Sequence, residues 1–232
     1  MVRPLMTKTA LMAAAVISLF LIALTPLTEA APSSGSDYDT IIRDARKLEE
    51  SGKVKEALDK YTLAMKSAPD KAEPLARASM LHLILKNPRE ALAAASRAVE
   101  IEPAHEGAWL NKSVIEIYSG LYKEALATTN KALQRFPENT DIMNNKATAL
   151  LALHKLNDAE DTLLEALKIK PDDSSLNYNL ACAYALSEVR MSAILYLEKA
   201  IALDPALKIK ARTDPDLTSI RDSKFFKDLT AD

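Results

Sequence analysis

The residues best suited to acid–base, nucleophilic or metal chemistry are three histidines and one cysteine in a chain of 232 residues. His82, His105 and His154 fall at different places in the repeat pattern described below, and Cys182 has no basic neighbour at a spacing that would activate a thiolate. The sequence also contains no HExxH, GxSxG, phosphate-loop, dinucleotide-binding or CxxC motif. We therefore expect no enzymatic activity, no bound metal and no cofactor, and turn to binding chemistry.

The composition is that of a globular and largely helical protein. Hydrophobic residues make up 48% of the chain, too many for an intrinsically disordered protein, and a single cysteine excludes a disulfide-stapled miniprotein. The 30 Lys and Arg residues nearly balance the 32 Asp and Glu residues. Because a nucleic-acid surface usually needs a strong basic excess, we expect no nucleic-acid partner.

The N-terminus has the pattern of an export signal. Residues 1–8 carry two cations and no acid, and residues 10–24 are apolar except for Ser18. As a helix this run is about 22 Å long, which is short of the roughly 30 Å needed to cross a bilayer core. Small residues at Thr28 and Ala30 favour cleavage after Ala30.

We therefore predict a signal peptide over residues 1–30 and a flexible leader over residues 31–37. The alternative is an uncleaved N-terminal anchor, the only case in which we expect membrane contact. Both alternatives export the rest of the chain, most simply to a bacterial periplasm or another part of the cell envelope.

A repeat of 34 residues organises most of the sequence. It is marked by five equally spaced prolines, Pro69, Pro103, Pro137, Pro171 and Pro205. When this proline is numbered position 32, positions 20 and 27 are Ala in every unit and position 8 is Ala or Ser. The predicted units are residues 38–71, 72–105, 106–139, 140–173 and 174–207.

Each unit reads as a pair of helices. Apolar residues recur at helical spacing in two stretches, which are separated in units one and three by Gly52 and Gly120 at the same offset. Small residues at positions 8, 20 and 27 allow the helices to approach closely. One such pair cannot bury its apolar faces alone, so the units must stack.

The units resemble tetratricopeptide repeats. Trp109 matches the large residue of this family at position 4, Tyr61 the aromatic residue at position 24, and Leu180 with Ala181 the pair at positions 7 and 8. The resemblance implies an all-α fold: a right-handed superhelical solenoid of five helix-turn-helix hairpins with a C-terminal helical cap. The sequence departs from the family pattern at His82, Ala95, Thr129 and Asn177, where we expect weaker packing.

The cap is predicted over residues 208–232, because Asp214-Pro215 would interrupt a sixth first helix. Asp214 and Ser223 are suitable N-caps for two short helices. The side chains expected to cover the apolar end of the fifth unit are Ile209, Leu217, Ile220, Phe225, Phe226 and Leu229.

The resemblance also implies a concave surface lined by the first helix of each unit. Position 6 of that helix is Arg43, Arg77, Asn111, Asn145 and Asn179. An Asn column could satisfy the backbone of an extended peptide, and the two arginines could receive a carboxylate, although they could equally pair with acids such as Glu73. Apolar residues also fall on concave positions: Met80, Leu83, Ile84, Leu110, Val114, Ile117 and Tyr118. They form either an exposed strip for a partner or part of the packing beneath a neighbouring helix.

We therefore predict a non-catalytic adaptor of the cell envelope that binds a protein or peptide partner in its groove. Two alternatives remain at this stage. One is a self-associating structural protein, which would be a homo-oligomer, and the other is an accessory subunit of an envelope enzyme.

Overall fold

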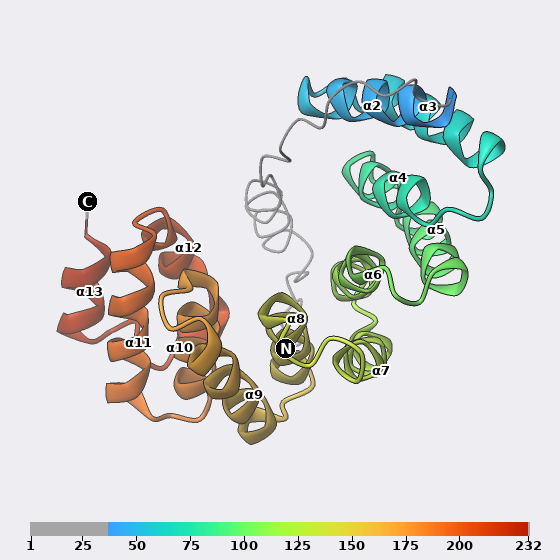
Figure 1. Ribbon diagram of the computed structural model, residues 1–232. Helices are drawn as coiled ribbons and strands as arrows, with labels where there is room; N and C mark the ends of the chain where they lie inside the picture. The colour runs from blue at the N-terminus through green and yellow to red at the C-terminus, as the bar shows by residue number, and fades with distance from the viewer. Residues whose placement is uncertain (1–36, 232) are drawn as a thin grey trace, which may run out of the picture. The chain divides into compact units, whose positions relative to one another are not determined.

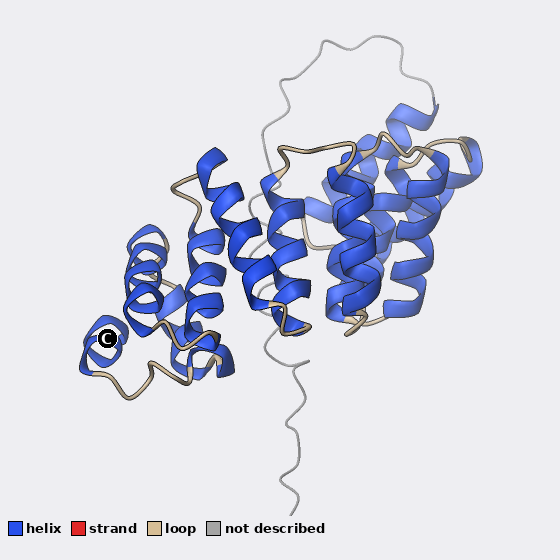
Figure 2. Ribbon diagram, turned by 90° about the horizontal axis from the view of Figure 1, so that it is seen from below, coloured by secondary structure: helices blue, strands red, loops and turns tan. Residues whose placement is uncertain are grey.

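The computed structural model describes residues 37–231 and is helical throughout them. These residues form twelve α-helices and one short 3-10 helix, with no strand among them. Figure 2 shows the helices joined by short loops. The all-α prediction is confirmed, whereas the predicted signal peptide and nearly all of the leader lie outside the described residues. Within the described part, no helix has both the length and the apolar character that a membrane span requires.

Each predicted 34-residue unit contains two of these helices, which we call its first and second helix. The pairs are α2 (Asp37–Glu50) with α3 (Val54–Ser67), α4 (Glu73–Ile84) with α5 (Pro88–Ile101), α6 (Glu106–Tyr118) with α7 (Tyr122–Leu133), α8 (Thr140–Ala152) with α9 (Leu156–Ile169), and α10 (Ser174–Leu186) with α11 (Arg190–Leu203).

The chain also divides into two larger compact parts, which we call the N-terminal and C-terminal units to distinguish them from the 34-residue repeats. The boundary lies between α6 and α7, inside the third repeat. The described part of the N-terminal unit holds α2 to α6, and that of the C-terminal unit holds α7 to α13. Within each unit, consecutive helices pack against each other in chain order, as Figure 1 shows for α2 to α5 and for α8 to α11. This packing of successive helix pairs is that of a repeat solenoid.

The columns of small residues hold the helices together. All fifteen residues at positions 8, 20 and 27 are 0 or 1% exposed: Ala45, Ser79, Ser113, Ala147 and Ala181, then Ala57, Ala91, Ala125, Ala159 and Ala193, then Ala64, Ala98, Ala132, Ala166 and Ala200. A larger side chain at these contacts would push the helix axes apart. Close contact between the two helices of a repeat, predicted from these columns, is confirmed in the four repeats that each lie within one unit.

The first helices lie on the inner side of each unit. In the N-terminal unit α4 contacts α6, and in the C-terminal unit α8 contacts α10. The second helices have no comparable contact with each other among the described residues. Successive first helices are therefore closer together than successive second helices, so each unit curves toward a face formed by its first helices.

Position 4 shows how a departure from the repeat pattern is accommodated. The indole of Trp109 donates a hydrogen bond to the carbonyl of Pro103 at 2.9 Å. Asn177, at the same position two repeats later, is fully buried and donates from Nδ2 to the carbonyl of Pro171 at 3.1 Å and of Asp173 at 2.8 Å. The Asn177 side chain thus donates a hydrogen bond to the preceding proline carbonyl, as the Trp109 indole does in its own repeat.

The cap consists of α12 (Leu207–Thr213), the 3-10 helix η1 (Pro215–Leu217) and α13 (Lys224–Thr230). The predicted N-caps are confirmed: Asp214 accepts a hydrogen bond from the Asp216 amide at the start of η1, and Ser223 accepts one from the Phe226 amide in α13. Leu217, Ile220 and Phe226 are buried in the core of the C-terminal unit, and Leu229 packs against it.

The prediction was wrong for two cap residues. Ile209 is 73% exposed and Phe225 is 65% exposed. Neighbouring residues of a helix point in different directions, so only one residue of the Phe225-Phe226 pair can face the core. In α12 the packed positions are Leu207 and Ala211, which leaves Ile209 on the opposite side.

The turn between the two helices has the same backbone conformation in every repeat. Position 15 has a positive φ each time: Gly52 (73°), Lys86 (61°), Gly120 (74°), His154 (56°) and Glu188 (60°). Glycine adopts this left-handed conformation without the steric cost that other residues incur. The sequence placed Gly52 and Gly120 at the same point of the turn. The same left-handed backbone conformation also occurs in the three repeats that have Lys, His or Glu there.

We expect Gly52→Ala to lower the free energy of unfolding by about 1 kcal/mol, because an alanine Cβ disfavours positive φ. A Cβ at this site would meet no other atom within 4 Å, so the loss would come from the backbone alone. The matched variant Glu188→Gly should be stabilising by up to about 1 kcal/mol. Urea unfolding measures both effects, and an unchanged Gly52→Ala protein would contradict the conformational explanation.

Candidate binding site

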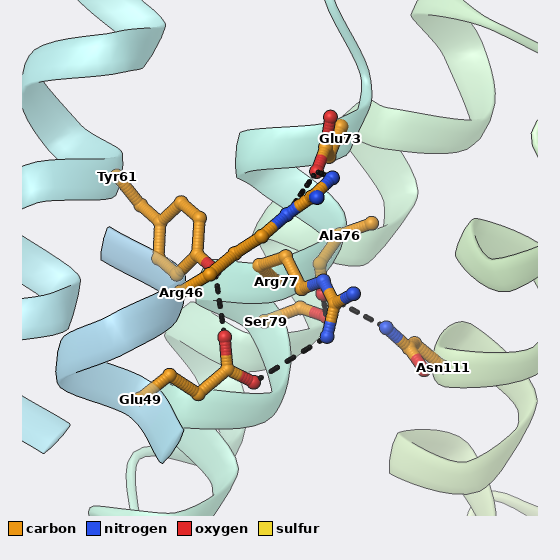
Figure 3. A network of polar contacts seen from close by, with 8 residues as sticks. All are labelled: Arg46, Glu49, Tyr61, Glu73, Ala76, Arg77, Ser79 and Asn111. Atoms are coloured by element: carbon orange, nitrogen blue, oxygen red, sulfur yellow. Dashed lines mark hydrogen bonds and ion pairs between the residues drawn. The ribbon is translucent and has the colours of Figure 1, made fainter. Parts of the chain in front are cut away.

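Charged side chains join the first two repeats on the first-helix face of the N-terminal unit (Figure 3). Arg46 in α2 donates from Nε to Oε1 of Glu73 in α4 at 3.2 Å, and its Nη2 forms an ion pair with the same oxygen. Both side chains are about one third exposed, at 37 and 30%. The pair therefore links two first helices while remaining in contact with solvent.

Glu49 in α2 forms the second link. Its Oε2 accepts a hydrogen bond from the Tyr61 hydroxyl at 2.7 Å, and its Oε1 lies 3.6 Å from Nη1 of Arg77 in α4. The Glu49 side chain is only 8% exposed, so it needs such partners to remain charged. Burial, and then the hydrogen bond to Glu49 and the charge of that carboxylate, raise the pKa of Tyr61 well above its usual value.

These contacts decide between the alternatives that the sequence left open for the arginines. Glu73 pairs with Arg46, and Arg77 pairs with Glu49. Arg43 is exposed, and its Nη2 donates a 3.4 Å hydrogen bond to the Thr40 hydroxyl. Arg43 is thus the cation of this face that is most available to a ligand.

The asparagine column mainly connects neighbouring first helices. Asn111 in α6 donates from Nδ2 to the carbonyl of Ala76 in α4 at 2.8 Å, and Asn179 in α10 donates to Oδ1 of Asn144 in α8 at 2.7 Å. Asn145 is only 6% exposed. The expectation of a continuous ladder open to a peptide is therefore wrong at Asn145, and at Asn111 and Asn179 one amide N–H is already engaged.

The apolar residues of this face divide into two groups. Leu83 and Ile117 are buried, at 4 and 8% exposure, so for these two candidate binding residues the packing alternative holds and not the exposed strip. Both occupy position 12 of their repeats. The other three residues at this position, Glu49, Leu151 and Ala185, also have buried side chains. Leu83 packs with Ala91, Ala95 and Ile115 in one core cluster.

The remaining apolar side chains are accessible on α4 and α6. Ile84 is 44% exposed, and the other four residues are half-buried. Met80, Val114 and Tyr118 pack against the cluster that contains Leu83, which places them together. We call the five residues the apolar strip: Met80, Ile84, Leu110, Val114 and Tyr118.

Cys182 is buried at the contact between α10 and the cap. Cys182 is 3% exposed, and burial, with smaller effects of Asp214 and Asp216, raises the pKa of its thiol. The thiol and the two carboxylates lie within 4.8 Å of one another, but Asp214 accepts from the Tyr178 hydroxyl at 2.8 Å and from the Asp216 amide at 3.1 Å. We assign this cluster to holding the cap against α10.

The three histidines remain separate. His105 caps α6 by accepting a hydrogen bond at Nδ1 from the Ala108 amide at 3.1 Å. His154 occupies a left-handed turn, and His82 is half-buried on α4.

Family models describe two stretches of the chain as tetratricopeptide repeats, residues 78–140 and residues 116–181. Residues 78–181 of this chain are therefore tetratricopeptide repeats. A comparison with curated proteins found no match.

Several solved structures are similar to this chain over most of its length. MamA from Desulfovibrio magneticus RS-1 is 16% identical with a TM-score of 0.65, over 75% of this chain and 98% of MamA. TTC0263 from Thermus thermophilus is 21% identical with a TM-score of 0.61, over 78% of this chain and 94% of its own. YrrB, a protein with an unusual peptide-binding site, is 21% identical with a TM-score of 0.59, over 75% and 92%. At these identities the likeness concerns the fold.

The sequence interpretation missed two members of the polar network, Arg46 and Glu49. Arg46 falls at position 9 of its repeat and Glu49 at position 12. An available signal was that Glu49 is an acid in a column that is otherwise apolar. A charge in such a column indicates a compensating partner nearby.

We expect Tyr61→Phe to lower the free energy of unfolding by about 1 to 3 kcal/mol at neutral pH, because the buried Glu49 would lose a hydrogen bond. Adding Glu49→Leu to this variant introduces the residue type of Leu83 and Leu151 and removes the buried acid. The double variant should therefore recover part of the loss in urea unfolding. If the double variant instead loses the sum of the losses of Tyr61→Phe and Glu49→Leu measured separately, Tyr61 and Glu49 are not coupled.

Alkaline pH should also weaken the fold through this tyrosine. Because the pKa of Tyr61 is higher in the folded chain than the value of about 10 in an unfolded chain, its contribution is complete below about pH 10 and is lost as the pH rises further. The free energy of unfolding, measured between about pH 9 and 11.5, should fall less steeply in Tyr61→Phe than in the wild type. Equal slopes would show that Tyr61 ionises alike in both states.

Proposed function

We propose that this protein is a non-catalytic protein-interaction scaffold whose N-terminal unit binds a peptide segment or partner helix on its first-helix face. The observation that carries this proposal is the apolar strip on α4 and α6, in which Ile84 is 44% exposed. Its other members, Met80, Leu110, Val114 and Tyr118, are half-buried, and accessible apolar groups on one face are characteristic of interaction sites.

The polar network beside the strip supports the same proposal. Arg46, Glu49, Glu73 and Arg77 hold one another across α2 and α4, so their side chains lose little freedom when a ligand arrives. Arg43, which is exposed on the same helix as Arg46, supplies a cation for an acidic group of the partner. The favoured ligand is therefore a segment with apolar anchors and an acid toward its α2 end.

The similarity to YrrB adds support from the fold. That protein is described as having an unusual peptide-binding site, and its structure matches this chain with a TM-score of 0.59. A stack of helix pairs of this kind can therefore present a peptide-binding surface.

We also propose that the protein works in the bacterial cell envelope. This rests on the sequence alone: two cations before the apolar run at residues 10–24, followed by small residues at Thr28 and Ala30. Mass spectrometry of the protein secreted by a bacterial host should find a mature N-terminus at Ala31. An intact N-terminus would favour an anchor, and a chain retained in the cytoplasm would contradict export.

Selection from a phage-displayed library of random peptides tests the binding proposal. We expect enriched peptides to share apolar residues at fixed spacing, and Ile84→Asp to weaken their binding at least tenfold, measured by calorimetry. An Asp at this position would place a charge against the apolar anchors. Circular dichroism should remain unchanged because Ile84 is exposed.

Leu63→Asp is the matched control. Leu63 is 47% exposed in the same unit but lies on the second helix α3. It should bind the selected peptides like the wild type. Equal loss in both variants, or none in Ile84→Asp, would contradict the assignment of the site to the first helices.

A further inference from the structure

The outward face of α11 differs from that of every other second helix. At position 18 the first four repeats have Lys55, Arg89, Lys123 and Asn157, whereas the fifth has Met191. At position 22 they have Asp59, Ala93, Ala127 and Asp161, whereas the fifth has Leu195. All ten residues are exposed, Met191 by 73% and Leu195 by 55%. Only the fifth repeat places two large apolar side chains at these solvent-facing positions.

These residues form a stripe along one side of the helix. Met191 and Leu195 are one turn apart, and the exposed Ala202 lies two turns beyond Leu195 on the same side. The opposite side of α11 is packed into the core through Ala193, Leu197, Ala200 and Ile201. The stripe is thus a second apolar side of a helix whose first apolar side is already buried.

We propose that two copies of this chain pair through α11, with Met191 and Leu195 of each copy in the contact. A two-fold axis places the two helices antiparallel. An axis between Leu195 and Glu198 sets the large Met191 of one copy against the small Ala202 of the other. Leu195 then lies beside the axis against the aliphatic part of Glu198 of the other copy, and a contact of large Met191 with small Ala202 forms at each end.

The charges around the stripe favour a second copy as the occupant. The exposed charged residues of α11 and the turn before it are two acids, Glu188 and Glu198, and two cations, Arg190 and Lys199. In the antiparallel arrangement Glu198 comes within reach of Lys199 of the second copy. A balanced rim is complementary to itself, whereas a surface for anionic lipid or a strongly charged partner would carry one sign in excess.

The exposed apolar area of the stripe indicates how tightly two copies should bind. Two partly exposed side chains, Met191 at 73% and Leu195 at 55%, present far less than the roughly 800 Å² per partner of a stable interface, even after the polar rim is added. We therefore expect a dimer that dissociates in the micromolar range rather than an obligate one.

Sedimentation equilibrium of the full chain, purified as its bacterial host processes it, tests this pairing over about 1 to 300 μM. The wild type should pass from monomer to dimer. The double variant Met191→Lys with Leu195→Asp installs the residue types of Lys55 and Asp59 from the first repeat. It should remain monomeric over the same range, with unchanged circular dichroism because both positions are exposed.

The matched control changes equally exposed apolar residues of the cap. Ile209→Lys with Phe225→Asp should dimerise like the wild type, since these residues lie on α12 and α13. The proposal is overturned if the wild type stays monomeric at the highest concentration, or if the α11 variant dimerises as well as the wild type. It is also overturned if a monomeric wild type binds vesicles of phosphatidylglycerol and loses that binding in the α11 variant. Because the peptide site is on α4 and α6, peptide binding by Ile84 variants is independent of this result.

Discussion

Close approach of helices through alanine and serine is the constraint on which the rest of this structure depends. Positions 8, 20 and 27 are almost completely buried in each repeat. A pair of helices joined in this way still has uncovered apolar sides, and these are buried only when the next pair packs beside it. At the C-terminus the cap performs this task with Leu217, Ile220 and Phe226 in place of a sixth pair.

The same packing determines where binding chemistry can lie. First helices approach one another within each unit, so their facing positions are filled by packing residues such as Leu83 and Ile117. Longer polar side chains at the edge of that contact are held by partners on the neighbouring helix, as Arg46 is by Glu73. What remains available to another molecule is the apolar strip together with Arg43. A surface of this kind, supported by contacts between its helices, is suited to binding a chain segment.

The sequence predicted those features that follow from periodicity and local backbone chemistry. The alanine columns, the two helices of each repeat and the caps at Asp214 and Ser223 all depend on residue type at a fixed offset. It did not predict which acid meets which arginine, because long side chains reach several partners and the choice depends on helix separation. It also misjudged exposure where neighbouring residues compete for one core, as at Phe225 and Phe226, and it overlooked Met191 and Leu195, which keep the helical pattern while changing the surface.

The central claim, that the first-helix face of the N-terminal unit binds a protein segment, is tested most directly by hydrogen–deuterium exchange of the full chain with and without a selected peptide. Our account predicts slower amide exchange in α4 and α6, a smaller effect in α2, and unchanged exchange in α9 and α11. Protection confined to second helices, or to the C-terminal unit, would contradict it.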